Sequence, residues 1–131
     1  MTGIKQLDRL LAQISPEMGA DEYIFATFTG AKYADLSHLS PIASFQEKEG
    51  LTLVIERTVA KNAHIPFDSR FKKISLQVHS SLDAVGLTAA VSGVLAQKGI
   101  SANIMAAYFH DHIFVPSDQA EEALAALKDL S

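Results

Sequence analysis

Two periodic patterns in the second half of the chain restrict its fold more than any other feature. The segment KKISLQVHS alternates Ile74, Leu76 and Val78 with polar residues, which is typical of a strand with one buried face. Further along, apolar residues recur at i, i+3, i+4, i+7 and i+8 from Leu87 to Leu95, which predicts an amphipathic helix. Gly99 follows as the residue that ends this helix in the left-handed conformation. A strand followed by a helix is therefore the most firmly predicted unit.

The remainder of the second half adds two strands and a last helix. ISANIMAAYF predicts a strand, His110 and Asp111 a tight turn, and HIFVP the next strand. A helix follows, with Ser117 or Asp118 as its N-cap. The order β-α-β-β-α is that of a ferredoxin-like α+β sandwich, in which helices cover one face of an antiparallel sheet.

The first half contains a weaker version of the same order. An N-terminal helix over residues 4–14 precedes a strand at 22–30, a loop, and then a hairpin over 42–55. We expect Gly50 to take the left-handed position of the hairpin turn. A short helix over 58–63 closes this half.

The two halves predict two modules, residues 1–70 and residues 71–131. The second module ends after its second helix, so the fourth strand of its sheet has to come from elsewhere. Residues 23–28 or a neighbouring subunit are the candidates. An unpaired apolar sheet edge invites association, which favours a shared sheet or a dimer.

Composition excludes several classes of protein. The formal net charge of −4 argues against a nucleic-acid partner, which needs a basic surface. Strand residues 100–107 also lack the basic and aromatic side chains with which an RNA-recognition module stacks bases. The chain has no cysteine, its N-terminus does not resemble a signal peptide, and no apolar run approaches the roughly 18 residues of a membrane span. We therefore expect a cytoplasmic protein without a membrane partner.

The motifs of common enzymes are missing from the sequence. Neither G-x-S-x-G, H-E-x-x-H, nor a nucleotide-binding glycine loop occurs. His110, Asp111 and His112, together with His79, are the remaining candidates for binding a metal, although a polar turn is the preferred explanation of the first three. We expect no enzyme activity, no cofactor and no metal centre.

Three short motifs in the second half resemble those of the ACT domain. Val85-Gly86-Leu87 opens the helix, Lys98-Gly99-Ile100 ends it, and Asn103-Ile104 enters the next strand. The resemblance covers residues 73–130, and the first half is similar to the leading module of small bacterial two-ACT proteins. The tandem ACT modules of aspartate kinases and of arginine-sensing proteins are also similar. The resemblance implies a regulatory, allosteric fold that binds a small ligand, commonly an amino acid, at an interface between ACT units of a homodimer.

The same resemblance implies where such a ligand would bind. Free N–H groups at the start of a helix suit a carboxylate, and Gly86 allows close approach because it has no Cβ. Asp83 could take the ammonium group, and Asn103 offers both a donor and an acceptor. The candidate ligand-binding residues are Asp83, Val85, Gly86, Leu87, Ala102, Asn103 and Ile104.

Structural roles explain the same residues without a ligand. Gly86 could serve helix–sheet packing, Asn103 a backbone group at the strand end, and Asp83 a helix cap. Three functions follow in order of preference. The first is a non-enzymatic amino-acid sensor acting as a homo-oligomer, whose state an unidentified protein partner reads. The second is an interaction or regulatory subunit with a vestigial pocket, and the third is a small metal-binding protein that uses His110 and His112.

Overall fold

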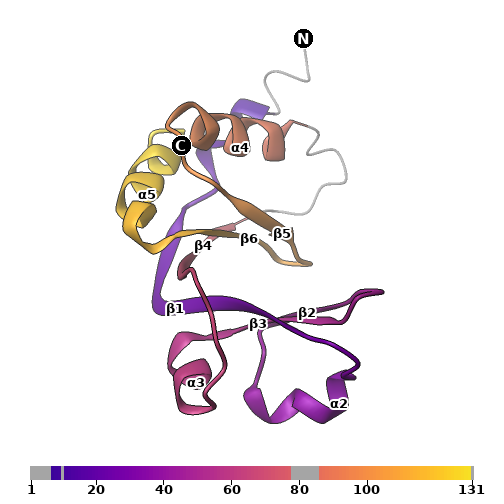
Figure 1. Ribbon diagram of the computed structural model, residues 1–131. Helices are drawn as coiled ribbons and strands as arrows, with labels where there is room; N and C mark the ends of the chain where they lie inside the picture. The colour runs from indigo at the N-terminus through magenta and orange to yellow at the C-terminus, as the bar shows by residue number, and fades with distance from the viewer. Residues whose placement is uncertain (1–6, 10, 78–85, 131) are drawn as a thin grey trace. The chain divides into compact units, whose positions relative to one another are not determined.

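The computed structural model describes residues 7–9, 11–77 and 86–130 (Figure 1). Residues 7–9 and 11–12 are helical, in agreement with the helix predicted for the N-terminus. The described elements that follow are β1 (Glu17–Phe28), α2 (Tyr33–Leu36), η1 (Ser37–Leu39), β2 (Ala43–Gln46), β3 (Leu51–Glu56), α3 (Arg57–Asn62), β4 (Phe71–Gln77), α4 (Leu87–Gln97), β5 (Asn103–Ala106), β6 (His110–Pro116), η2 (Ser117–Gln119) and α5 (Ala120–Lys128).

The chain forms two compact units. The C-terminal unit consists of residues 1–20 and 72–131, and the central unit consists of residues 21–71. In the C-terminal unit the strands are ordered β1-β4-β6-β5, and in the central unit they are ordered β2-β3-β1. Both orders are those of a ferredoxin-like sheet, so the predicted fold class is confirmed.

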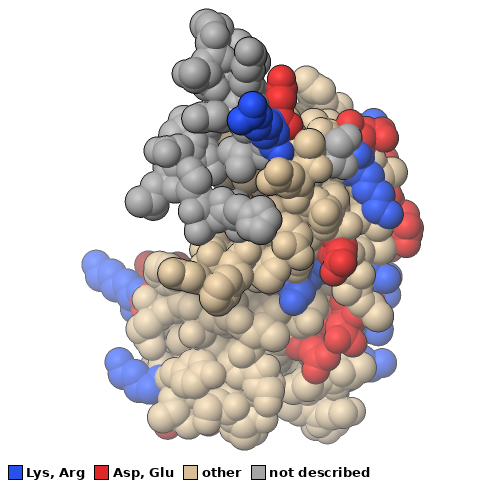
Figure 2. All heavy atoms as spheres, turned by 180° about the vertical axis from the view of Figure 1, so that it is seen from behind, with Lys and Arg blue, Asp and Glu red and all other residues tan. Residues whose placement is uncertain are grey.

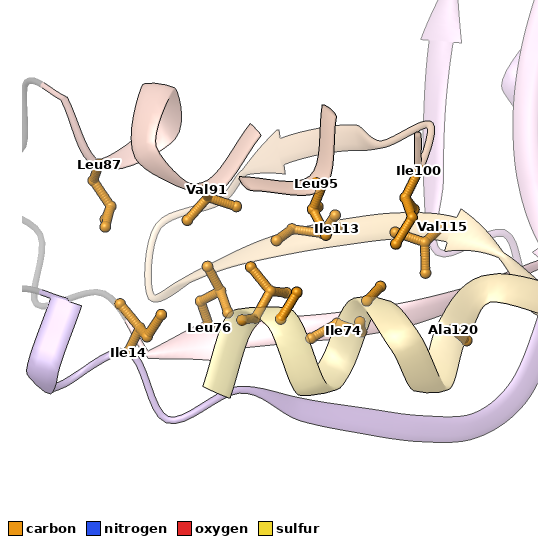
Figure 3. Packing of buried hydrophobic residues seen from close by; sticks show 13 residues of the cluster. Ile14, Ile74, Leu76, Leu87, Val91, Leu95, Ile100, Ile113, Val115 and Ala120 are labelled. Atoms are coloured by element: carbon orange, nitrogen blue, oxygen red, sulfur yellow. The ribbon is translucent and has the colours of Figure 1, made fainter. Parts of the chain in front are cut away.

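The core of the C-terminal unit lies between its sheet and helices α4 and α5. Leu87, Val91 and Leu95 of α4 point toward the strands, where they meet the alternate residues of β4 and β6 (Figure 3). Ile74 and Ile113 are completely buried there. The alternate residues of the strands and the residues at helical spacing in α4, which the sequence predicted to be buried, therefore pack in one apolar cluster.

The beginning of β1 supplies the strand that the second half lacks. β1 is hydrogen-bonded beside β4, and its residues 17–20 belong to the C-terminal unit. Just before β1, the backbone N–H of Gln77 donates to the carbonyl of Ile14, with N and O 2.6 Å apart. The sequence offered residues 23–28 or a neighbouring subunit for this place, but the residues that serve this unit come earlier in the strand that contains residues 23–28.

The central unit has its own apolar cluster. β3 pairs antiparallel with β1, with Ile24 opposite Ile55, and with β2, with Phe45 opposite Thr52. The buried residues of the cluster are Ile24, Leu39, Leu51, Leu53, Ile55 and Ala60. Because η1 and α3 contribute Leu39 and Ala60, helical elements cover one face of β1 and β3.

The β2–β3 hairpin forms as predicted, but its glycine has another role. The φ angle of Gly50 lies outside the left-handed region, so that part of the prediction was wrong. A Cβ on Gly50 would lie 2.9 Å from the carbonyl oxygen of Phe28 and 3.2 Å from Cα of Thr29. Glycine is required because neighbouring backbone leaves no room for a side chain.

The β5–β6 turn lies earlier than predicted. His110 and Asp111 are the first residues of β6, and Asp111 pairs with Ala106 of β5. The turn consists of residues 107–109, where the N–H of Ala107 donates to the carbonyl of His110 at 2.9 Å. At the other end of β6, the N-terminus of α5 is preceded by η2 and has no side-chain cap, contrary to the prediction.

Two glycine substitutions separate steric crowding from backbone freedom. Gly50→Ala should destabilise the fold by about 1–3 kcal/mol, because its methyl group would overlap backbone atoms that cannot rotate away. Gly93→Ala should stabilise it by about 0.5–1 kcal/mol, since Gly93 lies inside α4 with open space at its Cβ position. Denaturant unfolding measures both changes. Equal stability of the two variants would contradict the assigned role of Gly50.

Candidate functional site

A polar hollow opens on the sheet of the C-terminal unit. Its volume is about 240 Å³. It is lined by Ser15, Glu17, Ser75, Gln77, His110 and His112. All six side chains can donate or accept hydrogen bonds, and they come from β4, β6 and the chain around the start of β1. The hollow therefore brings six polar side chains together on one face of this unit.

Strand alternation places these side chains together. Ile74 and Leu76 of β4 point into the apolar cluster, so Ser75 and Gln77 point to the opposite face. In β6, Ile113 and Val115 join the cluster, and the even-numbered His110 and His112 share the other face. Helices α4 and α5 cover the apolar face, and the polar face is the one that carries the hollow.

Contacts among β4, β6 and the chain before β1 define the geometry of the hollow. Oγ of Ser75 lies 2.8 Å from Nδ1 of His112, which joins β4 to β6 through side chains. The ring centroids of His110 and His112 are 5.9 Å apart, with the rings tilted by 42°. Ser15 has a φ of 40°, an uncommon conformation for a residue with a side chain. The chain before β1 is held in this conformation beside Gln77, which binds the carbonyl of Ile14.

Burial and neighbouring charges shift the pKa of His112, which lines the hollow, and of Asp111, the residue before it on β6. The pKa of His112 is lowered from 6.5, first by burial and then by the positive charges of Lys73 and His110, while Asp111 opposes the shift. The pKa of Asp111 is raised from 3.8 by burial, and the imidazole of His112 opposes that shift. His112 is therefore predominantly neutral at neutral pH, and it can act as both a hydrogen-bond donor and an acceptor.

The structure separates the residues that the sequence predicted for ligand binding. Leu87 is 2% exposed, and Ala102 and Ile104 pack with it in the apolar cluster. Asn103 is exposed on β5 and lies opposite Phe114, while Met105 lies opposite His112. By alternation, Asn103 therefore faces the polar side of the sheet, away from Leu87.

The remaining predicted residues lie at or before the start of α4. Gly86 is the N-cap of α4 with φ 99° and ψ −18°, a conformation that favours glycine. A Cβ there would meet the side chain of Leu7 at 3.7 Å, an ordinary contact distance. Its backbone conformation is thus sufficient reason for a glycine at this position. Asp83 and Val85 lie outside the described residues.

Four residues of the hollow had no place in the sequence prediction, namely Ser15, Glu17, Ser75 and Gln77. A signal for two of them was present, because Ser75 and Gln77 alternate with buried Ile74 and Leu76. His110 and His112 were noticed as neighbours, but we assigned His110 to a turn and only His112 to the strand, so their common face on β6 was not predicted. Ser15 and Glu17 reach the hollow only through the pairing of β1 with β4, which no local pattern reveals.

The hollow resembles neither a metal centre nor a hydrolase site. Within the described residues, no group of three or more His, Cys, Asp or Glu side chains is placed to hold a metal ion. Ser75 and His112 form a serine–histidine pair, but hydrolases orient that histidine through a carboxylate on its other nitrogen. No such hydrogen bond to His112 is found in the part of the chain that the structure describes.

The charged side chains do not form a basic surface on the face shown in Figure 2. Lysines and arginines are scattered there beside aspartates and glutamates, with uncharged areas between them (Figure 2). Such a face does not provide the continuous positive patch that phosphate backbones require. No helix among the described residues is long and apolar enough to span a membrane.

The sequence matches the ACT domain twice, over residues 2–72 and over residues 67–129. Together the two matches span residues 2–129. The chain belongs to the ACT-domain family.

Solved structures give the same fold. A Vibrio cholerae protein of unknown function, described as a possible transport protein, is 50% identical, with 98% of each chain covered and a TM-score of 0.89. A protein from Agrobacterium tumefaciens is 18% identical, with 90% of this chain and 89% of that chain covered and a TM-score of 0.69. The ligand-free regulatory subunit of aspartate kinase from Thermus thermophilus is 13% identical, with 91% and 98% covered and a TM-score of 0.68. A search of curated proteins gives no match.

The lowered pKa of His112 makes a prediction for titration. In the folded protein, the NMR-detected midpoint of His112 should lie below 6.5, because burial and Lys73 disfavour the imidazolium. Lys73→Gln should raise that midpoint, whereas Lys98→Gln, at the exposed end of α4, should leave it in place. A midpoint at or above 6.5 in the unaltered protein would contradict the described environment.

The same shift predicts how His112 affects stability. Between its folded pKa and 6.5, the unfolded chain binds a proton that the folded chain does not bind. The contribution of His112 is therefore present above 6.5 and is lost as the pH falls through this window. His112→Gln should make the free energy of unfolding depend less on pH in that range. Denaturant titrations of both proteins measure the difference, and an unchanged pH dependence is the contrary result.

Proposed function

We propose that this protein is a non-enzymatic regulatory protein that senses an amino acid through two ACT modules, residues 1–70 and 71–131. The observation that supports this function most directly is that the two ACT matches together account for residues 2–129. The likeness to regulatory subunits of aspartate kinases supports the fold on which such sensing depends. Under this proposal the chain acts in the cytoplasm as a homodimer.

Regulation by such a protein requires a difference in affinity between two states. A ligand shifts a conformational equilibrium only if it binds one state more tightly than the other. ACT modules that bind an amino acid at their interface would favour one arrangement, and a partner protein would respond to that arrangement. We call the residues that the family resemblance offers for this ligand the family-like site. They are Asp83, Val85, Gly86, Leu87, Ala102, Asn103 and Ile104, and of those that the structure describes Asn103 has an exposed side chain.

Thermal denaturation with each standard L-amino acid tests the sensing function. A ligand present at about a hundred times its dissociation constant adds about 2.7 kcal/mol to the stability of the folded state. That gain should raise the midpoint of unfolding by several degrees for a chain of this size. A dose-dependent rise with one amino acid or a related group supports the proposal. Midpoints that stay constant across the whole panel would rule it out.

Asn103 provides a test of the family-like site. Its side chain is exposed on β5, so Asn103→Ala should preserve the fold. If Asn103 contacts the amino acid, the alanine variant should lose most of the thermal shift. Asn62→Ala, at the exposed end of α3, is the matched control and should retain the full shift. Equal shifts in both variants would remove Asn103 from the binding site.

Exposed aromatic residues favour a second function, that of an interaction module. Tyr108 and Phe109 are 81% and 70% exposed in the β5–β6 turn. Their rings pack edge to face, with the ring centroids 4.8 Å apart. Large exposed aromatic side chains are typical of surfaces that contact other proteins.

Size-exclusion chromatography with light scattering tests whether these aromatic residues form a contact between two copies of the chain. The unaltered protein should be a dimer, and replacing both Tyr108 and Phe109 by serine should give a monomer if they form the contact. A dimer that no amino acid stabilises would favour this second function.

A further inference from the structure

We propose that the polar hollow on the face of β4 and β6 binds a free amino acid, with the ligand's ammonium group at Glu17 and its carboxylate beside the two imidazoles. This inference rests on the proposed function of amino-acid sensing, and it places a ligand on the face of the sheet opposite α4 and α5. It is a different position from the start of α4, because α4 packs on the opposite face. Three properties of the hollow carry the argument, namely its charges, its donors and its volume.

Glu17 supplies the negative end of the site. Of the six lining residues it alone carries a carboxylate, and its side chain is exposed. A carboxylate accepts hydrogen bonds only, so its natural ligand in the hollow is a donor such as an ammonium group. The hydroxyl of Ser15 and the amide oxygen of Gln77 lie in the same lining and add acceptors for the remaining N–H bonds.

The imidazole side of the hollow supplies donors. When Ser75 donates to Nδ1 of His112, the proton of the neutral ring is on Nε2, which is then a donor for a ligand. His110 brings a second imidazole to the same face. Lys73 lies two residues before Ser75 on β4, and its positive charge is close enough to lower the pKa of His112. A carboxylate is the group that such a set of donors would hold.

Volume and charge together exclude other ligands. About 240 Å³ is below the roughly 300–1,000 Å³ of pockets for drug-sized ligands, which indicates a small metabolite. A phosphate would meet repulsion from Glu17, and a metal ion would lack a third ligand among the described His, Asp and Glu residues. A zwitterion is the small molecule that satisfies both a carboxylate and a cluster of imidazole and hydroxyl donors.

Calorimetry of one variant with two ligands tests the assignment of the ammonium group. The ligands are the amino acid that stabilises the protein most in the thermal panel and the deaminated acid with the same side chain. Glu17→Gln should weaken binding of the amino acid about tenfold or more, because a charged hydrogen bond is lost. It should not weaken binding of the deaminated acid, which has no ammonium group. Glu121→Gln, which removes an exposed carboxylate from α5, is the control and should bind both ligands normally.

The carboxylate end is tested with the same two ligands. His112→Gln and Ser75→Ala should each weaken the binding of both ligands, because both ligands carry the carboxylate. Since Glu17 is exposed, its variant is expected to fold even if a change at Ser75 or His112 disturbs the sheet. A circular-dichroism melt of every variant checks the fold before binding is measured.

The outcomes distinguish the site from the function. If an amino acid stabilises the protein, but Glu17→Gln binds it with unchanged affinity, the hollow is not the site and the sensing function stands. If Glu17→Gln weakens the binding of the amino acid and of its deaminated analogue equally, the assigned orientation of the ligand is wrong. If no amino acid binds the unaltered protein, both the hollow and the sensing function are overturned.

Discussion

The burial of alternate residues in β4 and β6 is the constraint on which the C-terminal unit depends. Ile74, Leu76, Ile113 and Val115 are removed from water beneath α4 and α5. Because side chains alternate along a strand, burial of these residues leaves Ser75, Gln77, His110 and His112 with only the other face to occupy. A shift of β6 by one residue would bury the two imidazoles without partners, and a shift of β4 would do the same to Ser75 and Gln77. The same hydrophobic effect that forms the core therefore assembles the polar hollow.

β1 connects the two halves of the chain in a way that neither half could achieve alone. Its first residues extend the sheet of the C-terminal unit, and its later residues pair with β3 in the central unit. The edge of β4 is thereby paired within the chain, which removes an exposed strand edge of the kind that promotes aggregation. This pairing also brings Ser15 and Glu17 to the hollow. The site thus combines residues that are far apart in the sequence, and its hydrogen bonds, Ser75 to His112 and Gln77 to Ile14, also join distant segments.

The sequence predicted the fold well where one physical signal dominates. Helix α4, strand β4 and the β2–β3 hairpin were found because their periodicity or their turn residues are strong. The turn before β6 was misplaced because His110 and Asp111 are as acceptable in turns as Ser and Asn, and only pairing with β5 settles the register. The role of Gly50 could not be predicted, since it depends on the backbone of Phe28, distant in sequence. The candidate site was harder still. The family motifs directed attention to the start of α4, whereas Glu17 joins the hollow only through strand pairing.

Binding of an amino acid on the polar face of the C-terminal sheet can be tested through the histidines of the two units. The imidazoles of His110 and His112 lie in that hollow, and those of His38 and His64 belong to the central unit. An NMR titration of the imidazole resonances with the stabilising amino acid distinguishes these two pairs in one experiment. We predict saturable shifts of His110 and His112 with little change at His38 and His64. Saturable binding that leaves His110 and His112 unmoved would contradict the account.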